Sequence, residues 1–156
     1  MDIFDRIKHD HDTLRDLLER IEDPDKASGE KDSRRAVFDE FQRELWAHGK
    51  VEEAVFYAAL AKHRDAKAET MEGLNEHHMI NGLAEELNAM PADSGAWTAK
   101  MQVLGELLRH HLDEEEDELF EEAREALADE RADELGRLYD ERKEHALAAL
   151  APLPRA

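Results

Sequence analysis

The chain has 156 residues, contains no cysteine and carries a formal net charge of −19, with 40 acidic residues against 21 lysines and arginines. The lack of thiols excludes disulfides, thiolate zinc sites, cysteine-ligated iron–sulfur clusters and cysteine nucleophiles, so any metal must be held by nitrogen and oxygen. The excess negative charge disfavours nucleic acid as a partner, because most of the surface would repel phosphate.

The length fits one domain that buries a core of its own. The first residues, Met1 to Arg6, lack the basic and then apolar run of a secretory signal. No apolar stretch approaches the ~20 residues of a membrane span. We therefore expect a cytoplasmic protein with no membrane partner.

Four long helices and a shorter fifth are predicted from apolar residues at steps of three and four, and from the few glycines and prolines between them. In chain order they run from about Ile3 to Ile21, Ser33 to Leu60, Ala68 to Ala89, Ala96 to Leu127 and Arg131 to Leu150. The expected fold is all-α: an up-down-up-down four-helix bundle with an additional C-terminal helix over residues 1–150, followed by a short tail, 151–156.

Each of the four long helices places a histidine in its apolar stripe. His11 follows Ile7 by four residues, and His77 is in step with Leu74 and Ile80. In the second and fourth helices a glutamate accompanies the histidine, giving the inward set His11, His48, Glu52, His77, His111 and Glu115. The other histidines, His9, His63, His78, His110 and His145, are interpreted as surface groups or as outer neighbours of the site.

The second and fourth helices share one motif, a histidine followed four residues later by a glutamate pair: His48 with Glu52-Glu53, and His111 with Glu115-Glu116. Residues four apart lie one above the other on a helix, so each imidazole and carboxylate can point at one position. Burying two carboxylates in an apolar bundle is costly unless a cation compensates them. Imidazole with carboxylate suits iron or manganese.

Counting ligands favours a dinuclear centre with open positions. Two six-coordinate ions offer twelve positions, of which four imidazoles fill four and two bridging carboxylates fill four more. The remaining positions are where O₂, peroxide or NO would bind. The ferritin-like di-iron pattern, Glu-x-x-His used twice, is disfavoured because no histidine has an acid three residues before it.

From His11 to about Phe120 the chain resembles the hemerythrin-like, or HHE cation-binding, domain family. The resemblance rests on Asp10-His11, His48-x-x-x-Glu52, Glu76-His77-His78 and His111-x-x-x-Glu115 with Leu119-Phe120. It implies a four-helix bundle around two non-haem iron ions with an oxo or hydroxo bridge. Carried over by position, His11, His48, His77 and His111 would be terminal ligands, and Glu52 and Glu115 would bridge the irons.

Two positions depart from the oxygen-carrying hemerythrins that this chain resembles. Those proteins have a further histidine one turn beyond the third-helix ligand, where this chain has Asn81. They also place the fourth-helix acid five residues after its histidine, which would select Glu116 instead of Glu115. The alternatives left open are Glu116 as the bridge and Asn81, His78 or His110 as a further ligand, and we expect reversible O₂ carriage to be disfavoured.

Three functions remain open at this point. The first is a non-haem di-iron protein that binds or reacts with O₂, peroxide or NO in sensing, scavenging or storage, with a separate protein partner if it is a sensor. The second is a di-iron enzyme, either an oxygenase or a catalase-like peroxide dismutase. An oxygenase needs an organic-substrate pocket, whereas Trp46, Phe56 and Tyr57 are interpreted as core aromatics. The third is an iron-handling or interaction module with a structural metal, for which manganese or zinc would accept similar ligands.

Overall fold

The computed structural model describes residues 1–23 and 33–150, and within them all regular structure is helical. The predicted all-α class is therefore confirmed. The five long helices are α1 (Ile3–Glu22), α2 (Arg34–Val51), α4 (Lys67–Asn88), α5 (Gly95–Glu114) and α7 (Asp129–Ala149). Short segments between them are η3 (Glu52–Tyr57), α3 (Ala58–Leu60), η4 (Arg64–Ala66), η5 (Glu115–Leu119) and α6 (Phe120–Ala126). The predicted tail, 151–156, lies outside the described residues, and so does Pro24, which follows the first predicted helix in the sequence.

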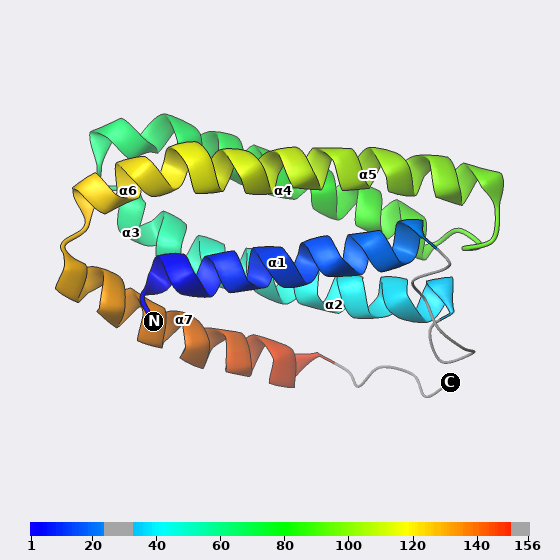
Figure 1. The fold of residues 1–156 in the computed structure, drawn as a ribbon, viewed down its shortest axis with the longest axis horizontal. Coiled ribbons are helices and arrows are strands. Elements are labelled where there is room, and N and C mark those ends of the chain that lie inside the picture. The colour runs from blue at the N-terminus through cyan, green and yellow to red at the C-terminus, as the bar shows by residue number, and fades with distance from the viewer. Residues whose placement is uncertain (24–32, 151–156) are drawn as a thin grey trace.

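Four helices run alternately up and down the molecule in the order α1, α2, α4, α5, as Figure 1 shows. The helix α7 packs on the outside of this bundle against α1 and α2 (Figure 1). The bundle with an added C-terminal helix is the predicted architecture. Within the described residues, no helix combines the length and the apolar character that crossing a membrane requires.

Side chains before the helices fix where three of them begin. Asp2 accepts a hydrogen bond from the Asp5 backbone N–H, and the Asp5 side chain accepts one from Asp2 in return. Ser33 and Ser94 each accept a hydrogen bond from the backbone N–H three residues later. Such caps satisfy backbone donors that the first helical turn leaves unpaired.

Two π-helical segments interrupt what the sequence predicted as continuous α-helices. The segment η3 begins at Glu52 and η5 begins at Glu115, so each starts at the first acid of a glutamate pair. A π turn is wider than an α turn and is found mostly as a single turn inside an α-helix, often at functional sites. Apolar periodicity does not reveal such a turn, because the apolar stripe resumes on the far side of it.

The core consists of two apolar clusters, one toward each end of the bundle. The first joins α1, η3, α6 and α7 around the ring contacts of Phe4, Phe56 and Phe120. The second joins α1, α2, α4 and α5 around Phe38 and Trp97. On α1 and α2 the inward histidine lies in sequence between residues of the two clusters.

Two residues predicted to be buried are exposed: Leu74 at 40 % and Trp46 at 37 %. On α4 the buried face passes through Thr70, Gly73 and His77, so Leu74 lies beside that stripe. Gly73 takes the inward place because Tyr57 fills the space in front of it; a Cβ there would lie 2.5 Å from the Tyr57 hydroxyl oxygen. The prediction for Leu74 was wrong because the inward position belongs to the neighbouring Gly73, and a glycine does not contribute to the apolar pattern from which helix faces are predicted.

Candidate metal centre

The six side chains predicted to point inward meet in one buried cluster, and each is at most 7 % exposed. His11 comes from α1, His48 from α2, His77 from α4 and His111 from α5. The glutamates Glu52 and Glu115 are the first residues of η3 and η5. We call these six residues the His/Glu cluster.

The cluster divides into two sets that share both glutamates. His11 and His48 form one set with Glu52 and Glu115, while His77 and His111 form the other. In each set one ligand atom from every residue lies within 4.8 Å of the others. The structure therefore contains two neighbouring groups of donors that could each hold a cation, with two carboxylates common to both.

Each glutamate turns one oxygen toward each set. Glu52 Oε2 lies 3.4 Å from His48 Nε2, and its Oε1 lies 3.1 Å from His77 Nε2. Glu115 Oε1 lies 3.2 Å from His11 Nε2, and its Oε2 lies 3.5 Å from His111 Nε2. This is the orientation that a carboxylate needs to bridge two ions.

Outer carboxylates orient three of the imidazoles through their other ring nitrogen. Nδ1 of His11 lies 2.7 Å from Glu116, Nδ1 of His77 lies 2.9 Å from Glu53, and Nδ1 of His111 lies 2.8 Å from Glu76. A carboxylate at Nδ1 places the proton there and leaves Nε2 as a donor for a metal. The second acid of each glutamate pair thus serves a histidine on another helix.

His48 has a different environment, which the sequence did not predict. Its Nδ1 lies 2.7 Å from the Tyr139 hydroxyl and 3.2 Å from Asp10. Tyr139 and Lys143, both on α7, also hydrogen-bond to Asp10. Asp10 and Tyr139 are both buried. The sequence feature that could have indicated these contacts is the spacing of Leu135, Tyr139 and Lys143 at steps of four, which places them on one face of α7.

Charges inside the cluster perturb its acid–base behaviour. Burial lowers the pKa of His77, but Glu52 and Glu53 outweigh it and raise that pKa to about 10. Burial likewise opposes protonation of His11, whose pKa the carboxylates of Glu115, Glu116 and Glu52 raise well above its ordinary value. Without a metal, protonated histidines balance the carboxylates of the cluster.

The two glutamates respond in opposite directions. Burial raises the pKa of both, but the charge of His48 and the closeness of other polar side chains lower that of Glu52 well below its ordinary value. Burial and the nearby negative charge of Glu52 raise the pKa of Glu115. Two carboxylates packed together cannot ionise equally unless positive charge is close to both.

Several polar atoms of the cluster are buried without a hydrogen-bond partner: His11 Nε2, His48 Nε2, both oxygens of Glu52 and Glu115 Oε1. Buried polar atoms are almost always paired, and each exception requires a cause. All five face the interior of the cluster, where a cation would take lone pairs from nitrogen and oxygen. The donor set therefore fits divalent metal ions.

The alternative ligands considered from the sequence lie elsewhere. Glu116 is on the outer side of His11, and His78, His110 and Asn81 are exposed. His77 and Glu115, and not His78 and Glu116, belong to the buried groups of donors that could hold a cation. The assignment of these residues as ligands stays a prediction.

The comparisons with known proteins agree with this geometry. Residues 2–123 match the model of the family described as Hemerythrin HHE cation binding domain. The fold is similar to that of a hemerythrin HHE cation binding domain-containing protein from Mycobacterium kansasii, with a TM-score of 0.81 and 23% sequence identity over 96% of this chain and 89% of that one. No curated protein matches the chain.

Proposed function

Because the chain belongs to the hemerythrin HHE cation-binding domain family, we propose that it holds two non-haem iron ions in the His/Glu cluster and binds or reacts with O₂, peroxide or NO. The terminal ligands are His11 and His48 for one ion and His77 and His111 for the other. Glu52 and Glu115 bridge the pair. The role of such a protein is sensing, scavenging or storage of the small ligand.

The observation that carries this proposal is the division of each glutamate between the two sets of histidines. Every oxygen of Glu52 and Glu115 lies within 3.5 Å of the Nε2 atom of a different histidine. A buried network that served only stability would pair these atoms by hydrogen bonds, yet five of them have none. Two ions would satisfy all of them at once.

When bound, a pair of irons supplies Lewis acidity and electrons to a small ligand. The protein holds the four imidazoles by carboxylates or a hydroxyl at Nδ1, which leaves Nε2 as the nitrogen that would bind a metal. Tyr57 adds a proton donor at the edge of the cluster, since its hydroxyl donates a hydrogen bond of 2.6 Å to Glu115 Oε2. Burial and the neighbouring glutamates raise the pKa of Tyr57 well above its ordinary value, so this proton is retained near neutrality.

The space beside the cluster favours a small ligand over an organic substrate. A hollow bordered by Gly49, Ile80 and Leu108 reaches His48, His77 and His111 and holds about 10 Å³. A second hollow reaches His111 and Glu115 and holds about 20 Å³. These volumes are close to that of one water-sized probe, which suits a diatomic molecule or peroxide and not the substrate of an oxygenase.

The proposal is tested by metal analysis of the purified protein, joined to absorption spectra before and after anaerobic reduction and exposure to O₂, peroxide and NO. We expect two irons per chain and near-ultraviolet bands that bleach on reduction and return with the reacting ligand. His48→Ala and Glu115→Ala should each lose metal while far-ultraviolet dichroism is unchanged. The matched control is His78→Ala, since His78 is exposed next to His77 and should retain full metal content.

Absence of metal after purification, together with no uptake of ferrous iron under anaerobic conditions, would contradict the di-iron proposal. Two manganese or zinc ions in place of iron would keep the ligand assignment and overturn the proposed chemistry. Loss of metal in His78→Ala with retention in His77→Ala would overturn the assignment on α4.

A second candidate function is catalase-like dismutation of peroxide, in which two hydrogen peroxide molecules give two waters and one O₂. The position of Tyr57 favours it, because breaking an O–O bond consumes protons and this hydroxyl holds one at the cluster edge. The same iron-loaded samples distinguish the two candidates. Sustained evolution of O₂ from peroxide supports the enzyme, whereas a single spectral change without turnover supports binding.

A further inference from the structure

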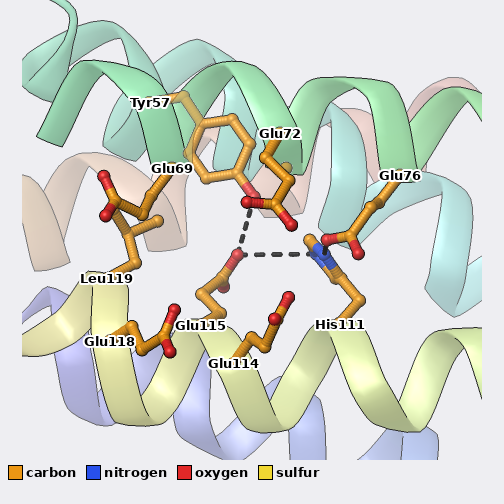
Figure 2. Close-up of a pocket in the computed structure, with 10 residues that line it drawn as sticks. Tyr57, Glu69, Glu72, Glu76, His111, Glu114, Glu115, Glu118 and Leu119 are labelled. Atoms are coloured by element: carbon orange, nitrogen blue, oxygen red, sulfur yellow. Dashed lines mark hydrogen bonds and ion pairs between the residues drawn. The ribbon is translucent and has the colours of Figure 1, made fainter.

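An acidic cleft opens between α4 and the helical segment formed by α5 and η5, and it leads to the His/Glu cluster. Figure 2 shows its carboxylates facing one another across the gap between the two helices. His111, Glu115 and Tyr57 lie at its inner end (Figure 2). Its acidic lining consists of Glu69, Glu72 and Glu76 from α4 and Glu114 and Glu118 from α5 and η5. We call these five residues the cleft glutamates.

The cleft ends at a buried carboxylate of the His/Glu cluster. Glu115 is 3 % exposed, and its Oε2, on the side of His111, accepts a hydrogen bond from Tyr57. Its Oε1 faces His11 on the other side and forms no hydrogen bond. The cleft holds about 20 Å³, which is room for one water-sized particle. This volume suits a metal ion and is too small for an organic substrate.

The approaches to the cluster from α1 and α7 carry positive charge. Lys8 and Arg15 lie 3.7 Å and 2.6 Å from Glu116, which covers His11. Lys143 pairs with Asp10, which covers His48. A divalent cation approaching from α1 or α7 would meet these side chains before it reached a ligand.

The cleft glutamates have no such compensation. Among the described residues, none of them forms an ion pair with a lysine or arginine; Glu76 and Glu114 have only histidine partners. At the mouth, His110 adds a nitrogen whose distance to oxygens of Glu76 and Glu114 is within 4.8 Å. A cleft lined by charge of one sign attracts counter-ions and raises their rate of association.

We propose that this cleft is the route by which divalent metal ions enter the His/Glu cluster, with the cleft glutamates attracting the cation and handing it to His111 and Glu115. This inference depends on the proposed metal centre. The same field disfavours anionic ligands such as superoxide or nitrite on this route. Neutral O₂, NO and hydrogen peroxide are unaffected by it.

The test measures the rate of Co²⁺ uptake by the metal-free full chain from the growth of its visible absorption in a stopped-flow instrument. The variant is Glu72→Gln with Glu118→Gln, two exposed cleft residues that contact no member of the cluster. We expect the second-order uptake rate to fall about tenfold at an ionic strength of about 0.01 M, and the difference to shrink at about 1 M salt. The amount of cobalt bound at saturation should not change.

Two controls separate the local field from net charge and from folding. Glu85→Gln with Glu106→Gln removes two exposed charges from the same helices, α4 and α5, outside the cleft, and should load at close to the original rate. Glu72→Asp with Glu118→Asp keeps the charge and should restore the rate.

Equal uptake rates in the cleft variant and the original chain, or equal slowing in the Glu85/Glu106 control, would overturn the entry route. Either result would leave the metal centre standing, because saturation is measured in the same experiment. If the original chain binds no cobalt at saturation, and none of the ferrous iron offered anaerobically, the metal centre itself is wrong.

Discussion

The two acids of each glutamate pair have different roles at the cluster. The first acid, Glu52 or Glu115, turns into the cluster, and the second, Glu53 or Glu116, accepts a hydrogen bond from Nδ1 of a histidine on another helix. In the proposed metal centre, one dipeptide thereby supplies both a ligand and the orientation of a different ligand. The dipeptide occurs in both η3 and η5, which gives the cluster its near-symmetry.

At the residue scale, the metal-free protein should lose stability as pH rises from about 6.5 toward 10. Folding raises the pKa of His77 from 6.5 to about 10 and raises those of His11 and His48. The folded state therefore binds more protons than the unfolded state across this range, so deprotonation favours unfolding. Urea unfolding at several pH values checks this through a midpoint that falls with rising pH.

At pH values below that range, urea unfolding should show the opposite trend, with stability falling as pH falls. Folding lowers the pKa of Asp10 and Glu52 below their ordinary values, so their contribution is present above those values and is lost as pH falls. Greatest stability is expected between about 4.5 and 6.5. A midpoint that is constant or rises between about pH 6.5 and 9.5 would show that protonated histidines do not hold the metal-free cluster together.

At the element scale, the packing of α4 against η3 determines where the Tyr57 hydroxyl lies. Only a glycine at position 73 leaves room for this hydroxyl. A Cβ on α4 at this position would lie 2.5 Å from the hydroxyl oxygen and 3.0 Å from the ring carbon that carries it. The Tyr57 ring also stacks on His77 at an interplanar angle of 19°. Close approach of the two segments thus connects a helix contact to the cluster.

Gly73→Ala should therefore displace Tyr57 from Glu115 and destabilise the fold by about 1–3 kcal/mol through overpacking. Tyr57→Phe removes the clashing oxygen, so the double substitution should cost less than the sum of the two single ones. Thermal or urea unfolding of the four chains measures this coupling. Additive costs would mean that the backbone of α4 shifts and Tyr57 stays in place.

At the scale of the whole molecule, α7 is part of the site although it lies beyond residues 2–123 that match the family. Its Tyr139 and Lys143 hydrogen-bond to Asp10, and its Leu135 and Tyr139 belong to the first core cluster together with Ile3. Gly136 allows α7 to approach the backbone of Met1 and Asp2, where a Cβ would lie within 2.8 Å of an oxygen. We propose that residues 1–150 form one folding unit.

A chain that ends at Ala128 should accordingly lose more than about 3 kcal/mol of stability, because Asp10 would lose Tyr139 and Lys143 and the first core cluster would lose the apolar side chains of α7. A chain that ends at Leu150 is the control and should unfold like the original. Urea unfolding compares the three chains. Unchanged stability after removal of α7 would show that the four-helix bundle folds alone and that the predicted domain is shorter.

The sequence by itself determined the helix bundle and the identity of the inward side chains, because both follow from periodicity along single helices. His11, His48, His77 and His111 share the phase of neighbouring apolar residues, and that phase is a local property. Only the tertiary structure decided which oxygen of Glu52 or Glu115 faces which histidine, and which side chains bind each Nδ1. The roles of Asp10, Tyr139 and Lys143, the π turns and the acidic cleft depend on how helices far apart in sequence are rotated and spaced, and the period of one helix carries no information about its rotation against another.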